Sequence, residues 1–158
     1  MEQKVGNIVI EGAKLIFRNF QGKVSQYNKN GEKTVGILLP DDIAAKAEAD
    51  GWKVKYLRPR EDDPEQYKQP WLPTKLSYRF YPPTVVLITS RGKTMLDEQS
   101  VGKLDWANIQ NVDVVIRPYN YPGVNGGAPG ISAYIKSLYV TVQEDEFADK
   151  YADMPDIM

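Results

Sequence analysis

Short stretches in which apolar and polar residues alternate run along most of the chain, and turn-forming residues separate them. A period of two residues is typical of strands that bury one face. In the clearest example, Val35, Ile37 and Leu39 share one face of a strand. On this basis we predict strands at residues 8–18, 33–39, 52–57, 75–81, 84–90, 112–119 and 131–142.

Two segments instead favour short helices. Residues 41–50, DDIAAKAEAD, lie between Pro40, which ends the preceding strand, and Gly51, which would stop a helix. One of the two leading aspartates would cap the first turn. A second short helix is predicted within residues 97–105.

The last predicted strand changes its hydrophobic parity partway. Ala133 and Ile135 share one face, whereas Leu138 and Val140 have the opposite parity. Both pairs can face one core only if the strand slips by one residue, so we predict a β-bulge near Lys136-Ser137. Many short strands with one or two small helices indicate a mainly β fold, either a small barrel or a sandwich.

Charge is distributed unevenly, although the total is only −1. Residues 1–142 carry nineteen basic and fifteen acidic groups, a net charge of +4, whereas residues 143–158 carry one and six, a net charge of −5. Residues 68–94 hold five basic side chains and no acid. This segregation indicates a polyanionic partner for the body and sets residues 143–158 apart as an acidic tail. A tail that only aids solubility is the alternative.

The composition excludes several kinds of chemistry. The chain has no Cys and no His, so disulfides, thiolate chemistry, Cys-based zinc sites and serine–histidine catalysis are all ruled out. We expect no cofactor and no metal. The first residues, MEQKVGNIVIEG, lack the apolar core of a secretory signal, and the longest aliphatic run, residues 85–88, is too short to span a membrane. One soluble, cytoplasmic domain is expected.

Other motifs that could carry chemistry are weak. RGKT at residues 91–94 lacks the first glycine of a phosphate-binding loop, because Leu87 stands in its place. The glycines of residues 123–130 lie between two strands and do not open a helix. The carboxylates that could in principle hold Mg²⁺ for a nuclease are Asp97, Glu98, Asp105 and Asp113. Their spacing matches no metal-binding loop.

What remains is a set of basic residues interleaved with aromatic residues. Single-stranded nucleic acid is bound by a positive groove along its backbone and by aromatic rings on which bases stack. Acids near such a groove would repel phosphate, which accounts for their absence from residues 68–94. The candidate DNA-binding residues are Phe20, Lys23, Tyr27, Lys75, Arg79, Tyr81, Arg91, Lys93, Arg117, Tyr119, Tyr121, Tyr134 and Lys136. Tyr78 and Phe80 alternate with the charges and are expected in the core.

The chain resembles the OB-fold single-stranded DNA-binding proteins of tailed bacteriophages. The resemblance begins with FRNFQGKVSQYNKNGEKTVGILLP and DGWKVKY, continues through RGKTMLDEQSVGKLDWANIQNVDVVIRPYNY, and ends with GISAYIKSLYVTV before the acidic tail. It implies a small OB-like barrel over residues 1–142, with an inserted helix and a positive binding groove. It also implies no catalysis.

The expected function is therefore sequence-independent binding of single-stranded DNA, which the protein would coat and protect during phage replication or recombination in the host cytoplasm. Two other functions stay open: a protein-interaction or virion-associated β-domain, and a metal-dependent nuclease. The tail is expected to contact replication or recombination proteins, and its candidate residues are Phe147, Tyr151, Asp153 and Asp156. A mobile tail and a docked amphipathic helix are both compatible with its pattern.

Overall fold

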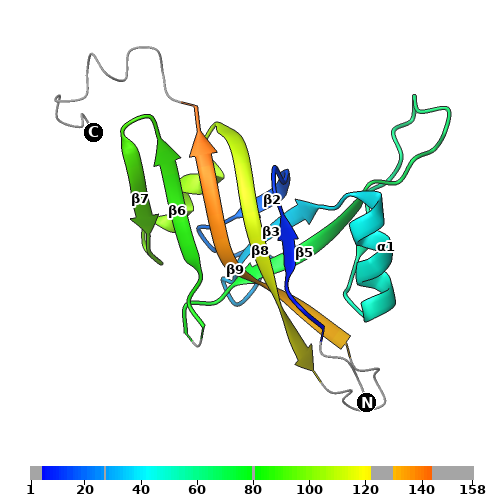
Figure 1. The fold of residues 1–158 in the computed structure, drawn as a ribbon, viewed down its shortest axis with the longest axis horizontal. Coiled ribbons are helices and arrows are strands. Elements are labelled where there is room, and N and C mark those ends of the chain that lie inside the picture. The colour runs from blue at the N-terminus through cyan, green and yellow to red at the C-terminus, as the bar shows by residue number, and fades with distance from the viewer. Residues whose placement is uncertain (1–4, 27, 80, 122–129, 144–158) are drawn as a thin grey trace.

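The computed structural model describes residues 5–26, 28–79, 81–121 and 130–143, and its strands form one mixed sheet (Figure 1). Within this part of the chain the strands are β1 (Ile8–Ile10), β2 (Leu15–Asn19), β3 (Lys33–Leu38), β4 (Lys55–Tyr56), β5 (Pro70–Leu76), β6 (Thr84–Thr89), β7 (Gly92–Leu96), β8 (Ile109–Tyr121) and β9 (Gly130–Val142). The helical elements are α1 (Asp41–Asp50) and the 3₁₀ helix η1 (Val101–Asp105). None of the described helices is long and apolar enough to cross a membrane.

The sheet curves into a small OB-like barrel. Its main path runs β1-β8-β9-β5-β3-β2, so the two ends of the path are strands that follow one another in the chain. Residues 11–14 join these two strands. Backbone hydrogen bonds from Ala13 N to Val112 O (2.7 Å) and from Leu38 N to Lys14 O (2.9 Å) tie the joint to both sides. The chain itself therefore closes the barrel.

The single strand predicted at residues 8–18 is wrong in one respect, because the structure divides it into β1 and β2. The break includes Gly12, whose φ of 66° lies in the left-handed region that glycine adopts without strain. The break allows β1 to pair with β8 while β2 pairs with β3.

The bulge predicted near Lys136-Ser137 is confirmed. Val115 is paired with Ser137, whereas Ile116 is paired with Ile135, so Lys136 is the extra residue in β9. The bulge also marks a change of neighbour: β9 pairs with β5 before it and with β6 after it. The hairpin of β6 and β7 extends the sheet on that side, where Figure 1 shows β7 at the outer border.

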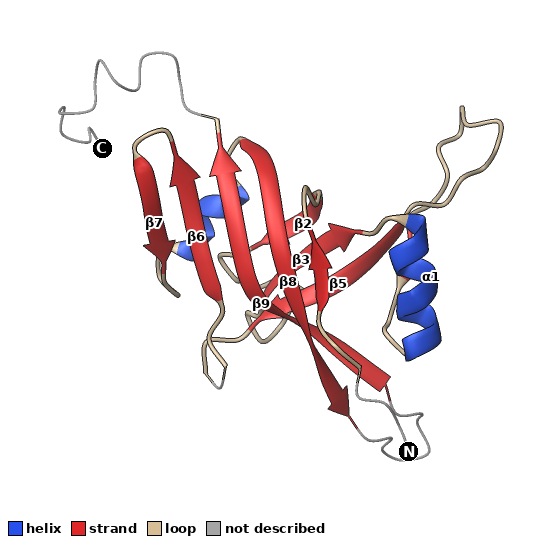
Figure 2. Ribbon diagram, viewed as in Figure 1, coloured by secondary structure: helices blue, strands red, loops and turns tan. Residues whose placement is uncertain are grey.

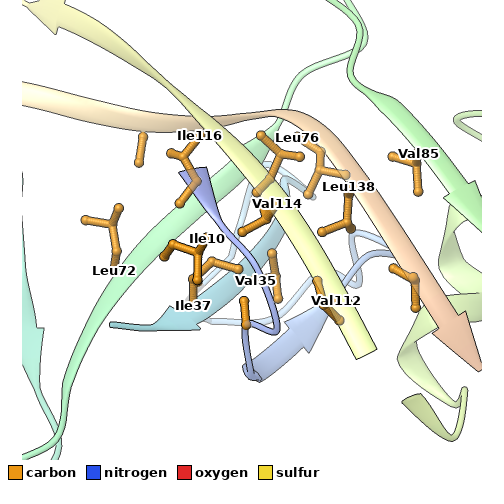
Figure 3. Packing of buried hydrophobic residues seen from close by; sticks show 14 of the residues in the cluster. Ile10, Val35, Ile37, Leu72, Leu76, Val85, Val112, Val114, Ile116 and Leu138 are labelled. Carbon is orange, nitrogen blue, oxygen red and sulfur yellow. The ribbon is translucent and has the colours of Figure 1, made fainter. Parts of the chain in front are cut away.

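Alternate residues of the strands fill the barrel with apolar side chains (Figure 3). The inward positions predicted for Val35, Ile37 and Leu39 are confirmed. Phe20 is also fully buried, so its prediction as a DNA contact is wrong. The cause is distant in sequence: a carboxylate oxygen of Asp105 accepts the backbone N–H of Phe20 at 2.7 Å, which fixes the chain there with the ring inside.

The strand predicted at residues 52–57 is shorter in the structure. The alternation of this segment predicts that Trp52, Val54 and Tyr56 face inward. Only β4 remains of the strand, and Trp52 is buried as predicted. Tyr56 is instead 47% exposed, and its hydroxyl donates a hydrogen bond to Glu48 on the surface of α1.

The strand predicted at residues 75–81 is displaced toward the N-terminus, since β5 ends at Leu76. Its first residues include Pro70 and Pro73, which are typical of a loop. One edge of β5 pairs with β4 at residues 70–71 and with β9 at residues 74–75. Pro73 lies between these two pairings, so its missing N–H removes no hydrogen bond from that edge. Proline therefore does not end this strand.

Helix α1 lies on one flank of the sheet (Figure 2). Gly51 ends it in the left-handed conformation, as predicted, but neither Asp41 nor Asp42 caps it with a side chain. The N-cap is Pro40, and the aspartates lie in the first turn, where the helix dipole still favours negative charge. The second predicted helix is the short η1.

Candidate nucleic-acid interface

Three of the predicted DNA contacts form a row across the outer face of the barrel. Arg117 of β8 is paired with Tyr134 of β9, and Tyr134 is paired with Lys75 of β5. On both sides of Tyr134 and Lys75 the neighbouring residues are buried, and Arg117 follows the buried Ile116, so these three side chains point away from the core. Strands that are far apart in the chain thus bring two cations and an aromatic ring side by side.

Tyrosine rings surround Arg117. Its guanidinium carbon lies 4.7 Å from the centroid of the Tyr81 ring and 5.3 Å from that of Tyr134, which are cation–π distances. Tyr119 packs edge-on against Tyr134 with ring centroids 6.0 Å apart. We call Tyr81, Arg117, Tyr119 and Tyr134 the tyrosine cluster. Tyr81 is 68% exposed, so the cluster offers ring surface to a ligand.

A groove of about 460 Å³ lies beside the tyrosine cluster, over β3, β5 and β9. Lys53, Lys55 and Lys75 line it together with Trp71 and Ser132. Lys75 belongs both to this groove and to the row with Tyr134, so the two features form one surface. The basic groove and the aromatic cluster are therefore continuous.

Phe17 forms the far side of this groove, and an irregular backbone holds it there. The β2–β3 register shifts between Ile16 and Asn19, which marks a β-bulge, and Phe17 takes a φ of 50°. Its ring is 63% exposed and packs edge-on against Trp71, with centroids 5.1 Å apart. A non-glycine residue in the left-handed region is strained, and strain of this kind clusters at binding sites.

Trp71 rests directly on the backbone of β3 at Gly36. A Cβ at position 36 would lie 2.8 Å from the Trp71 ring and 2.8 Å from the side chain of Ile16, closer than real Cβ atoms approach. The Lys55 ammonium lies 5.8 Å from the centre of the Trp71 ring, and the Lys53 ammonium lies 4.7 Å from that of Tyr121. Aromatic rings and cations thus alternate along the whole surface.

Two acids approach this surface from one side. Glu32 forms an ion pair with Lys75 at 3.3 Å, and both side chains are partly exposed. Glu32 and Glu98 also line a small cavity of about 200 Å³ that includes Tyr78 and Tyr134. Burial, with the nearby Glu98 carboxylate, raises the pKa of Tyr78 to about 12. Acids are absent from the sequence around Lys75 but not from the space around it.

Other predicted contacts lie away from the tyrosine cluster. Ile88 of β6 is paired with Lys93 on one side and with Thr141 of β9 on the other, so Lys93 lies level with Thr141. At about 3.3 Å per residue, Thr141 is roughly 20 Å along β9 from Tyr134. The remaining exposed candidates are Lys23 in the β2–β3 connection, Arg79 between β5 and β6, Arg91 in the β6–β7 turn, and Lys136 at the bulge. Tyr27 and the tail candidates lie outside the described residues, as does Phe80.

Three of the four carboxylates considered for a metal, Asp97, Asp105 and Asp113, have structural roles. Asp105 accepts backbone N–H groups from the β2–β3 connection, and Asp113 accepts the N–H of Gly12 at 3.0 Å. The Ser100 hydroxyl and N–H bond to Asp97 and lower the pKa of that carboxyl. Among the described residues, no three acids come together in a way that could hold a metal ion.

Four residues of the groove were not predicted from the sequence: Phe17, Lys53, Lys55 and Trp71. A signal existed for three of them. The two lysines alternate with apolar residues, and Trp71 lies within the acid-free stretch. Phe17 gave no signal, because only a bulge turns it outward and its sequence context is that of a buried strand.

Comparison with known proteins is consistent with this surface. A family model described as a putative phage ssDNA-binding domain matches residues 1–158. No curated protein sequence matches the chain significantly. Among solved structures, the single-stranded DNA-binding protein from bacteriophage Enc34 in complex with ssDNA is similar, with a TM-score of 0.53, 16% identity, and coverage of 92% of this chain and 96% of that chain.

Another structure of the Enc34 protein gives a TM-score of 0.50 at 18% identity, covering 98% of this chain and 97% of that chain. A C-terminal truncation of the same protein gives 0.51 at 15% identity, covering 91% and 95%. At these identities the solved structures show a shared fold, and the family model, which matches the whole chain, shows membership. The chain belongs to the family of putative phage single-stranded DNA-binding domains.

Proposed function

We propose that single-stranded DNA lies across the outer faces of β8, β9 and β5, from the tyrosine cluster to the groove beneath Phe17. The observation that carries this proposal is the continuous alternation of rings and cations on that face. Arg117, Tyr134 and Lys75 form its centre, and Trp71 with Lys55 forms its far end. No other nucleic-acid geometry matches such a surface as well, because only unpaired bases can stack on rings spaced along a basic groove.

The chemistry of this surface favours binding without base preference. Rings stack on any base, and each stacked base contributes about 1–3 kcal/mol. The cations Lys53, Lys55, Lys75 and Arg117 would contact phosphates, which carry no sequence information. The protein would thus coat single-stranded DNA during phage replication or recombination in the host cytoplasm. The Enc34 protein, whose fold this chain shares, is itself found in complex with ssDNA.

Measuring the affinity for fluorescent poly-dT across a salt series tests the electrostatic part. If four cations each neutralise one phosphate, log K should fall against log[salt] with a slope of about −3, at about −0.7 per phosphate. Arg117→Ala should reduce the slope by about 0.7 and weaken binding to all base compositions alike. A flat salt response, or a loss confined to one base composition, would contradict the proposal.

Removing single rings tests the stacking part. Tyr134→Ala and Trp71→Ala should each weaken binding by about 1–3 kcal/mol while the salt slope stays unchanged. Trp106→Ala is the matched control, since Trp106 is the most exposed tryptophan and lies outside the groove lining. Equal losses in the control and the two test variants would show that the effect is not specific to the rings of this surface, which would contradict the proposal.

A further inference from the structure

Strand β7 has an edge with no partner in the described part of the chain. It pairs only with β6, and Figures 1 and 2 show it at the border of the sheet. The backbone N–H and C=O groups on its outer side therefore have no ladder partner among the described residues. Such an edge is a ready template for another strand unless prolines, bulges or charges protect it.

The protection on β7 is slight. The ladder between β6 and β7 runs from Val85–Leu96 to Thr89–Gly92 without a register shift, so no bulge twists the edge away. The strand GKTML contains no proline and a single charge, Lys93.

Apolar side chains adjoin this edge. Met95 is 70% exposed and is paired with Val86 of β6, which in turn is paired with Tyr139 of β9. The three side chains therefore form one row across the sheet. Tyr139 is exposed as well. The edge thus offers both unpaired backbone groups and apolar surface, which are the two components of strand addition.

We propose that β7 pairs with β7 of a second copy of this chain, antiparallel and centred on Thr94. A two-fold axis makes any single strand edge complementary to itself in this arrangement. Centring on Thr94 uses the whole of β7: Gly92 faces Leu96 of the second copy, and Lys93 faces Met95 of the second copy.

Charge complementarity supports this register. It places Arg91, just before β7, beside Asp97 of the second copy, just after β7, and symmetry repeats the pair. Opposite charges across a strand pair stabilise it, whereas like charges destabilise it. A register centred on Lys93 would instead place two lysines face to face. The stem of Lys93 can also cover the exposed Met95 of the second copy.

The pairing leaves the DNA-binding face accessible. Lys93 of β7 lies level with Thr141, which is roughly 20 Å along β9 from Tyr134. The tyrosine cluster of each copy therefore remains outside the contact. The second copy would extend the sheet through β9, β6 and β7 and add a second DNA-binding face to the assembly.

Disulfide trapping tests the register, because the chain has no cysteine of its own. Directly opposed Cα atoms in an antiparallel pair lie about 4.5–5.5 Å apart, within disulfide range, so Thr94→Cys should cross-link under mild oxidation. Lys93→Cys is the matched control. In this register the Cα atoms of the two residues 93 lie diagonally across the strand pair, roughly 8 Å apart, which is beyond disulfide range. Preferential cross-linking at position 93, or equal cross-linking of both variants, would overturn the register.

Sedimentation of the uncross-linked full chain without DNA tests the association itself. Dimer should form reversibly as concentration rises above that of the 17.9 kDa monomer. Arg91→Asp should weaken it by roughly ten-fold or more, because two ion pairs become repulsive, and Lys46→Asp on α1 should not. A chain that stays monomeric overturns the proposal. If truncation after Val142 then produces the dimer, the tail of the same chain covers the edge instead.

Discussion

Adding one methyl group at Gly36 should separate two properties of the binding groove. In Gly36→Ala the new Cβ would lie 2.8 Å from the Trp71 ring and 2.8 Å from Ile16, so one or both side chains must move. Overpacking of this kind costs about 1–3 kcal/mol of the free energy of unfolding. The loss of glycine's freedom in the unfolded chain offsets about 0.4–1 kcal/mol of that. We expect a net destabilisation of roughly 1–2 kcal/mol.

The same substitution should weaken DNA binding beyond its effect on stability. Trp71 can relieve the clash only by lifting off β3, which changes its contact with Phe17 and its position as a stacking platform. Loss of one platform costs about 1–3 kcal/mol of binding free energy. Thermal unfolding measures the first effect, and fluorescence anisotropy with poly-dT, well below the melting temperature, measures the second.

A matched control and a double variant make the result decisive. Gly6→Ala adds the same methyl group where nothing lies within 4 Å, so its melting temperature and DNA affinity should stay close to those of the parent protein. In a Trp71→Ala background, Gly36→Ala should lose most of its effect on binding, because the two changes act through one ring. If Gly36→Ala binds DNA as tightly as the parent, or if the two losses add fully, the coupling between Gly36 and the platform is refuted.

Three further predictions concern two side chains and the acidic tail. Glu32→Gln should bind single-stranded DNA more tightly, because Lys75 no longer has to leave its ion pair with Glu32 to contact a phosphate; unchanged anisotropy titrations would contradict this. Tyr78→Phe should raise the free energy of unfolding by about 1 kcal/mol, because the Tyr78 hydroxyl is buried without a hydrogen-bond partner among the described residues. Between pH 10 and 12, Tyr78 ionises in the unfolded chain but stays protonated in the folded protein, so the free energy of unfolding of the parent should fall as pH rises through this range. Denaturant titrations should show a smaller fall for Tyr78→Phe. Truncation after Val142 should leave a folded protein that binds DNA several-fold more tightly at low salt, because a segment of charge −5 no longer competes for the basic surface; a large loss of stability, or unchanged affinity, would favour a docked tail.

Parts of this structure that depend on local pattern could be predicted from the sequence. The alternation of Val35, Ile37 and Leu39 gave the inner face of β3, and the change of parity after Ile135 located the bulge at Lys136. Part of the candidate DNA-binding surface was also predicted, since Lys75, Arg117 and Tyr134 lie side by side in the structure. In each case residue type and spacing alone carried the information.

The remaining features depend on contacts between distant segments. Phe20 stands in a polar connection, yet Asp105, far along the chain, fixes its backbone with the ring inside. Phe17 has the sequence context of a buried strand, yet a bulge against β3 exposes it. The ion pair of Glu32 with Lys75 likewise joins positions that no periodicity relates. The burial and the partners of these side chains depend on which distant segments pack together, and the local sequence around each residue does not show this.

The closure of the barrel by its first strands has a consequence for the order of folding. Residues 8–10 pair with residues 114–116, so they leave the ribosome long before their partners exist. Pairings at such sequence separation are slow, because a long loop must close before any contact compensates for its lost entropy. β2 and the bulge that carries Phe17 follow directly after β1, and Tyr134 arrives later still in β9. Both ends of the proposed DNA-binding face therefore depend on the last steps of folding, and a partly synthesised chain would lack the complete surface.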